Sequence, residues 1–370
     1  MNSMKKFKQV IFILIGLNIS SMIICSRNIY QRSYQPIPSI TTYWKNNSQG
    51  KNYTLNSRCL EDWAIFGRFN KKFLLKHQLP EKVPYRYSNK TVSREELKQE
   101  IEKIIDQVKS KNKPGKINNA VIFKDRDFNY RTQSGLLIIK LEKFPFVIKI
   151  FKENPKTFVK PYSKGFVPCT WFMMGGGISR YLAGFTRIPN LIKIKTDIRK
   201  SKAWSHKITT PNKWFGIPNN APWFVVEGKN MGKKRSHKIE YPSVYYLVCD
   251  HMEIERPLHL TNKKDRQDGI EISKLLGNKI DPHLPNFGIE KGTDKYVIID
   301  TEHLASAVGL RKPMKFNSYF DYYGTLIKKA VHDIFFTTKK ERLALQQQPL
   351  PHNLKLDVED AAYIDEVHDQ

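Results

Sequence analysis

The stretch Asp281-Pro-His-Leu-Pro-Asn286, which Asp300-Thr-Glu302 follows after a short interval, indicates the fold of this chain better than any other part of it. Asp281, Asn286 and Asp300 contribute two carboxylates and an amide. A carboxylate can accept a proton from a hydroxyl group, and hard oxygen donors can hold Mg²⁺ against phosphate oxygens. The three residue types in this order therefore indicate chemistry on a phosphate group.

The residues between these two motifs predict a β-hairpin. Residues 284–289 are expected to form a short strand, and residues 290–295 are a polar turn that contains a glycine. Residues 296–300 are an apolar, β-branched run that ends in an acid. Such a hairpin would place Asn286 and Asp300 at the same end of two neighbouring strands, where one cation could bridge them.

At these positions the chain resembles the protein-kinase-like superfamily. That family has an Asp, four residues, an Asn, and later an Asp that closes a strand, which Asp281, Asn286 and Asp300 match. Lys279-Ile280 and Thr301-Glu302 replace the His-Arg and Phe-Gly pairs of typical protein kinases. This variant is more similar to the aminoglycoside-phosphotransferase branch and to other atypical branches.

The resemblance implies a two-lobed α+β fold and a phosphotransferase activity. Asp281 would be the catalytic base, and Asn286 and Asp300 would bind Mg²⁺. ATP would be the phosphate donor, and a hydroxyl group of a protein or small molecule would be the acceptor. The resemblance extends over about residues 118 to 336.

Two strands are predicted upstream, at residues 135–144 and 146–151, with a turn at Pro145. In the related family, a lysine of the second strand contacts the nucleotide phosphates. Phe146-Val-Ile-Lys149 matches that strand, so the resemblance implies this role for Lys149, with Lys152 as the alternative.

Two more buried strands are predicted at residues 223–227 and 243–249. The second leads into Asp250-His-Met252, which resembles the hinge of the family. The resemblance therefore implies that Asp250 and Met252 lie at the adenine ring of ATP. A helix over residues 266–276 is expected before the Asp281 loop.

The chain departs from the family in two respects. It has no Gly-x-Gly-x-x-Gly between the first two strands, where Gly135 ends a polar loop. The family also pairs its strand lysine with a helix glutamate, but between Glu153 and Glu227 Asp197 is the sole acid. Asp197 could substitute, the pair could be absent, or Lys149 could be held otherwise. These departures leave a pseudokinase, which binds without turnover, as an alternative function.

The N-terminus predicts export. Residues 1–8 are basic, residues 10–17 are apolar, and small polar residues follow, which is the three-part form of a signal peptide. The apolar run is short beside the roughly 20 residues of a membrane span. Residues 1–26 are therefore predicted to be a signal peptide or a membrane anchor, and the protein is expected to be secreted or periplasmic rather than cytoplasmic.

The net charge of +28, from 63 basic and 35 acidic residues, favours an anionic partner. A basic exported protein that binds a polyanion without catalysis is thus a third interpretation. Tryptophans 204, 214 and 223 alternate with lysines and could stack on nucleic acid, although packing in the core is favoured. Cys59 and Cys169 could pair in an oxidising compartment.

The predicted organisation has four further parts. Residues 27–117 form an extension with one amphipathic helix, which begins at the capping box Ser93-Arg-Glu-Glu96. Residues 118–250 form the N-lobe with an insert, and residues 251–340 form the C-lobe with a helix over residues 318–336. Residues 341–370 form an acidic tail.

Overall fold

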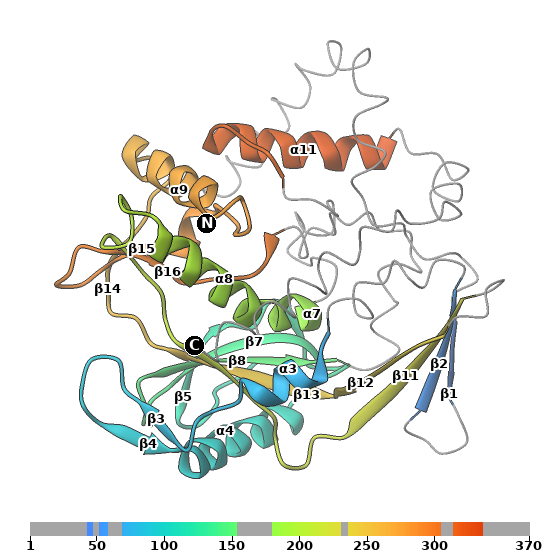
Figure 1. Cartoon of the computed structure of the whole chain (residues 1–370). Coiled ribbons are helices and arrows are strands. Elements are labelled where there is room, and N and C mark those ends of the chain that lie inside the picture. The colour runs from blue at the N-terminus through green and yellow to red at the C-terminus, as the bar shows by residue number, and fades with distance from the viewer. Residues whose placement is uncertain are drawn as a thin grey trace. The chain divides into compact units, whose positions relative to one another are not determined.

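The computed structural model describes residues 43–46, 52–57, 69–153, 180–230, 236–304 and 314–335. These residues form helices and several sheets (Figure 1), which confirms the predicted α+β class. The predicted signal peptide or anchor, Cys59, Cys169 and the acidic tail lie outside the described residues. Within the described part, no helix combines the length and apolarity that crossing a membrane requires.

The largest sheet is antiparallel and has six strands. Five of them lie in the order β10-β13-β8-β7-β5, and β6 pairs with β7. The predicted strand pair at Pro145 is confirmed as β7 and β8. The strands of this sheet are β5 (Ala120–Lys124), β6 (Phe128–Asn129), β7 (Ser134–Leu141), β8 (Phe146–Lys152), β10 (Lys213–Gly216) and β13 (Val244–Asp250).

Both faces of this sheet are buried at its central strand β13, whereas β5 exposes Val121 and Phe123. Side chains of a strand alternate between the two faces, and in β13 the odd-numbered residues join one core cluster while the even-numbered ones join another. Every residue of β13 is buried as a result. This confirms the buried strand predicted at residues 243–249, whose run of apolar residues is typical of a strand covered on both sides.

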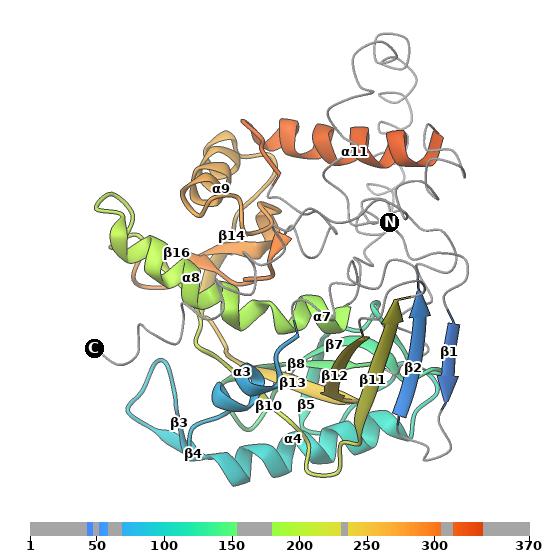
Figure 2. The same cartoon turned by 45° about the vertical axis from the view of Figure 1, so that its right-hand side comes forward.

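Helix α4 (Arg94–Lys109) covers one face of the sheet (Figure 2). Its first residue follows Ser93, whose hydroxyl accepts a hydrogen bond from the Glu96 N–H at 3.1 Å and so caps the helix. The predicted amphipathic helix is confirmed. Its apolar side packs against β5, β7, β8 and β13 through Leu97, Ile101, Ile104, Ile105 and Val108.

The extension before residue 118 holds more than this helix. It also contains β1 (Tyr43–Asn46), β2 (Asn52–Ser57), α3 (Lys71–Lys76), β3 (Lys82–Pro84) and β4 (Thr91–Ser93). The prediction of a single helix missed these elements because each is short. Strands of three to six residues depend on partners from elsewhere in the chain, as β2 does when it pairs in parallel with β11.

Helices α3, α7 (Arg180–Phe185) and α8 (Arg187–Lys200) supply the cover of the opposite sheet face. Aromatic rings dominate this cluster, with Phe185 stacked on Phe215 at 5.6 Å between centroids. Pro189 lies in the first turn of α8, where the missing N–H has no helical partner to lose. The helix begins at Arg187, and Ile188 packs in the aromatic cluster on this face of the sheet.

A second sheet has the order β1-β2-β11-β12, with β11 at Trp223–Asn230 and β12 at Ser236–Pro242. Residues 223–227 were predicted to be a buried strand. The strand exists, but Trp223, Phe224 and Val225 are only half-buried. The prediction of burial was wrong because β11 belongs to this separate sheet and not to the large one. Lys71 lies over the Trp223 ring at 4.8 Å.

The C-terminal part carries the predicted hairpin. Strands β15 (Phe287–Glu290) and β16 (Tyr296–Ile298) pair antiparallel, with Phe287 opposite Ile298. They belong to a sheet in the order β14-β15-β16-β9, with β14 at Ile254–Pro257 and β9 at Ile208–Thr209. Helices α9 (Lys263–Leu275) and α11 (Tyr319–Phe335) pack beside it, and a short 3-10 helix, η2 (Leu284–Asn286), precedes β15.

Candidate functional site

Lys149 lies in the middle of β8 and faces the side of the sheet that α8 covers. Phe151, two residues further along the strand and therefore on the same face, belongs to the aromatic cluster under α7 and α8. Lys149 is 5% exposed, and its Nζ lies 3.2 Å from Asp300 Oδ2. The fold therefore brings together the strand lysine and the acid at the end of the hairpin.

Arg187, at the start of α8, contacts the same carboxylate. Its Nε donates to Asp300 Oδ1 at 2.8 Å and its Nη2 to Asp300 Oδ2 at 3.1 Å. Nη2 also donates to Glu302 Oε2 at 2.7 Å, and the guanidinium lies over the Phe151 ring at 5.3 Å. Arg187 and Lys149 hold the pKa of Asp300 well below its usual range, because both cations favour the charged carboxylate over the opposing effect of burial.

Asp197 does not substitute for the missing glutamate. Its Oδ2 accepts from Lys279 Nζ at 3.0 Å, and this ion pair ties α8 to the loop before Asp281. The sequence left open whether Asp197 pairs with Lys149, whether the pair is absent, or whether another group holds Lys149, and the structure favours another group. Lys149 is held otherwise, through Asp300.

Asp281 lies at the start of its loop, where two groups donate to one of its oxygens. Oδ1 accepts from the His283 N–H at 2.9 Å and from Tyr322 Oη of α11 at 2.8 Å. No hydrogen bond to Oδ2 occurs among the described residues. Burial raises the pKa of Asp281, while the charge of His283 and the Tyr322 hydrogen bond oppose this shift.

Backbone contacts join the Asp281 loop to the Asp300 segment. The Ile299 N–H donates to Asn286 O at 2.8 Å, which places Asn286 and Asp300 at one end of the hairpin, as predicted. The Asn286 side chain donates through Nδ2 to Asp281 O at 3.2 Å. Asn190 of α8 donates to both segments, at Lys279 O and Thr301 O. One helix residue thus fixes the spacing of the two segments.

Asp250 is the last residue of β13, and Met252 follows two residues later, at the position predicted for a hinge. The carboxylate of Asp250 accepts from the Asn212 N–H at 2.8 Å and lies 3.7 Å from Arg86, so it stabilises the local backbone. The Asp250 and His251 amides donate to Asn212 O and Pro145 O. Met252 is buried, and among the described residues its N–H makes no hydrogen bond. Among the described residues the Met252 N–H therefore has no protein acceptor, whereas Asp250 is engaged within the protein.

Gly135 is the second residue of β7 and ends the polar loop that stands in place of a glycine-rich motif. It has φ +113, and a Cβ at this position would lie 2.1 Å from the Asp127 carbonyl oxygen. Only glycine fits this close approach of two backbone segments. The backbone geometry therefore requires glycine at position 135, whether or not a ligand binds there.

Lys213 of β10 is the third cation on this face of the sheet. Its Nζ donates to the backbone oxygen Ile299 O at 3.0 Å and to the side-chain oxygen Thr301 Oγ1 at 2.7 Å, so it binds the residues on both sides of Asp300. Burial, followed by the charge of Lys149, lowers the pKa of Lys213 to about 7. In the sequence, Lys213 is one of the lysines that alternate with tryptophans, where stacking on nucleic acid was one interpretation, and it was not predicted to lie at this site.

We expect Lys213 to make stability depend on pH. Because its pKa falls from 10.5 to about 7 on folding, the unfolded state binds more protons between these values, and stability rises with pH there. In Lys213→Met this contribution is absent. The measurement is the free energy of urea unfolding from about pH 6 to about pH 10. The wild type should gain stability relative to Lys213→Met as pH rises. Lys103→Met, at a side chain 69% exposed, should follow the wild type, and parallel wild-type and Lys213→Met profiles would contradict the expectation.

Of the two expected metal ligands, Asn286 could bind a divalent cation as it stands, but Asp300 could not. Asn286 Oδ1 accepts no hydrogen bond among the described residues, so it remains open to a cation. Asp300 accepts four N–H groups, from Lys149, from Arg187 twice, and from the Glu302 backbone. A carboxylate offers about four acceptor positions in all, so Asp300 does not fit as a Mg²⁺ ligand in this arrangement. No group of three or more His, Cys, Asp or Glu side chains with metal-site geometry occurs in the described ranges.

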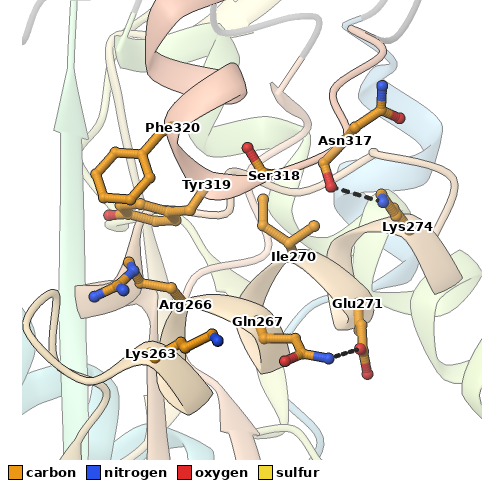
Figure 3. A pocket seen from close by; sticks show the side chains of 10 residues that line it. All are labelled: Lys263, Arg266, Gln267, Ile270, Glu271, Lys274, Asn317, Ser318, Tyr319 and Phe320. Atoms are coloured by element: carbon orange, nitrogen blue, oxygen red, sulfur yellow. Dashed lines mark hydrogen bonds between the residues drawn. The ribbon is translucent and has the colours of Figure 1, made fainter.

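A groove lies between α9 and the start of α11 (Figure 3). Its volume is ≈ 360 Å³. Tyr319 lines it, one helical turn from the Tyr322 that binds Asp281. Phe320 is 65% exposed and lies against Arg266, at 5.3 Å from the guanidinium carbon to the ring centre. The groove is thus lined by aromatic and basic side chains, and α11 links it to Asp281 through Tyr322.

Sequence analysis missed four residues of the site: Arg187, Glu302, Lys213 and Tyr322. Glu302 is part of the motif Asp300-Thr-Glu302, but no role was predicted for it. The other three lie in segments far from the motif along the chain, and no spacing in the sequence links them to it. A search for buried charge in apolar elements could have found Lys213, which lies on a strand beside Trp214 and Phe215.

Comparison of the chain with protein-family models, with curated proteins and with solved structures finds no significant match. The geometry of the site itself therefore has to support any function.

Proposed function

We propose that this protein is a phosphotransferase of the kinase-like class, with two lobes, which transfers phosphate from ATP to a hydroxyl group. The observation that carries the proposal is the meeting of Lys149 and Asp300 at 3.2 Å, beside the Asp281 loop. Residues 151 positions apart are joined there, in the order and on the elements that the resemblance implies. An incidental surface hairpin would have no reason to bring its last acid to the buried lysine of a different sheet.

Each residue then has a role that its environment supports. Asp281 would accept the proton of the attacking hydroxyl through Oδ2, while Tyr322 and His283 hold Oδ1. Lys149 would contact the phosphates, and the Met252 N–H would receive the adenine ring. Asn286 is the expected protein ligand of the Mg²⁺ that accompanies ATP. The acceptor would approach along the groove between α9 and α11.

A second candidate is a pseudokinase-type protein, which binds a nucleotide without turnover. The engagement of Asp300 by four N–H groups favours it, because active kinases use this acid as a metal ligand. Under either function we propose that residues 1–26 direct export or membrane attachment.

Nucleotide binding tests the proposal first. ATP with Mg²⁺ is expected to raise the melting temperature of the wild type, because a ligand that binds only the folded state stabilises it. Lys149→Met should weaken the apparent affinity by about tenfold or more, since one charge-assisted contact is lost. Lys152→Met is the matched control, because Lys152 lies on the same strand but on its opposite face, and it should bind like the wild type.

Transfer of labelled phosphate to water or to candidate acceptors then separates the two functions. Turnover supports the phosphotransferase, and binding without turnover supports the pseudokinase. The absence of any thermal shift at millimolar nucleotide, in a folded wild type, would contradict both.

A further inference from the structure

The carboxylate of Asp300 is saturated by donors of the protein itself. Oδ1 accepts from Arg187 Nε at 2.8 Å and from the Glu302 N–H at 3.2 Å. Oδ2 accepts from Lys149 Nζ at 3.2 Å and from Arg187 Nη2 at 3.1 Å. Two oxygens with about four acceptor positions are thereby filled. A metal ion could reach Asp300 only after one of these donors left.

The charges of the cluster are also balanced without a metal. In the ion pairs, Lys149 and Arg187 carry two positive charges, and Asp300 and Glu302 carry two negative ones. Lys213 lies beside them and adds positive charge when it is protonated, so no net negative charge is left for a metal to neutralise. The Arg187 side chain is 2% exposed, and the Asp300 side chain is 20% exposed. A divalent cation added to this neutral, largely buried cluster would bring uncompensated charge, which is costly in an interior.

Displacing Arg187 would cost more than one hydrogen bond. Its guanidinium binds two carboxylates and lies over the Phe151 ring. Its backbone carbonyl also accepts from Thr301 Oγ1 at 2.7 Å, next to Asp300. The planar fork of an arginine matches a carboxylate in a way that a point charge does not. Side chain and backbone of Arg187 together hold the segment 300–302.

We infer that Arg187 takes the place of a divalent cation at Asp300. The guanidinium neutralises Asp300 and Glu302 and sets the position of the segment, so no divalent metal binds to Asp300 in this protein. The inference rests on the contacts of Asp300 and not on the proposed function. Any metal that enters with a nucleotide would be held by its phosphates and by Asn286.

A titration with Mn²⁺ alone tests this inference. The bound fraction is followed by electron paramagnetic resonance for the full-length wild type and for Asp300→Asn, without nucleotide. Asparagine keeps the shape and removes the charge that a metal would need. The two apparent dissociation constants should agree to within about threefold, a difference smaller than the loss of one metal ligand would cause. A larger weakening in Asp300→Asn would overturn the inference.

Two further measurements apply if Asp300→Asn does not fold. In the wild type, diamagnetic Mg²⁺ should leave the NMR chemical shift of the Arg187 Nε–H unchanged, whereas a saturable shift of that signal would overturn the inference. Arg187→Gln should create a metal site, because two carboxylates then face only Lys149. If Arg187→Gln folds, its Mn²⁺ affinity should rise by about tenfold or more, and unchanged affinity would count against the inference.

These results are distinguishable from a failure of the proposed function. If nucleotide does not bind, the phosphotransferase and pseudokinase proposals fail, but the Mn²⁺ titration still decides the role of Arg187. If nucleotide binds and Asp300→Asn lowers Mn²⁺ affinity, the proposed function stands and the inference about Arg187 fails.

Discussion

Replacement of Arg187 by methionine should lower the free energy of unfolding by about 3–5 kcal/mol, which is the range for removing one partner of a buried ion pair. Methionine fills a similar volume but leaves Asp300 and Glu302 with Lys149 as their remaining cation. The Arg187 side chain is 2% exposed, so water cannot replace the lost hydrogen bonds. Urea unfolding at neutral pH measures the effect.

Two controls make this result specific. Arg187→Lys keeps the charge but loses the planar fork, so it should fall between the wild type and Arg187→Met. Lys143→Met removes an exposed ion pair with Glu96, whose side chains are 57% and 49% exposed, and should leave the free energy of unfolding nearly unchanged, because solvent screens such a pair. If Arg187→Met were no less stable than Lys143→Met, the cluster around Asp300 would not be the structural centre described above.

The pH dependence of this cluster has a definite sign. Arg187 and Lys149 hold the pKa of Asp300 well below its usual range. Asp300 therefore contributes stability above its unfolded pKa of about 3.9, and this contribution is lost only as pH falls through the lower folded pKa. Arg187→Met should accordingly begin to unfold at a higher pH than the wild type during acid titration.

Asp281→Asn should reduce the rate of phosphate transfer by about 10²–10⁴-fold, the usual contribution of a general base. The amide keeps the shape of the side chain and can still accept from Tyr322 and the His283 N–H, but it cannot take a proton. Nucleotide affinity should therefore change little, because the Met252 amide and Lys149 are untouched. Labelled-phosphate transfer and a thermal shift with ATP, measured on the same samples, separate the two effects.

Asp294→Asn is the matched control for Asp281→Asn. Asp294 is an exposed acid in the turn of the same hairpin, with φ 54, a conformation that asparagine also adopts readily. It should retain wild-type transfer. Because burial raises the pKa of Asp281, transfer by the wild type should decline as pH falls through that raised pKa, since the base is then protonated. Equal transfer by Asp281→Asn and the wild type would remove Asp281 from the chemistry.

The elements that sequence predicted well are those with strong local signals. Helix α4 has a capping serine at its first turn and an apolar side at helical spacing, so its start and its buried face both followed from the residues. The hairpin of β15 and β16 has a glycine turn between two apolar runs. In both cases the information lies within about twenty residues, and no distant partner is needed to interpret it.

The elements that sequence missed depend on distant partners. The strand at Trp223 was predicted correctly in kind, but its sheet and its exposure depend on β2, which lies far earlier in the chain. Strand β10 was not predicted, because its four residues lie between Pro211 and Pro218 and are too few to show an alternation of apolar and polar side chains. Its pairing with β13 nevertheless places Lys213 opposite Cys249, beside Lys149 and Asp300.

The sequence by itself determined the local chemistry of this protein. It predicted which loop carries Asp281, that a hairpin brings Asn286 and Asp300 to one end, and that Lys149 lies on a strand. Only the tertiary structure decided what surrounds Asp300. Arg187 and Lys213 reach it from a helix and a strand that no motif connects to the hairpin, because side-chain charges interact through space and short motifs record only neighbours along the chain.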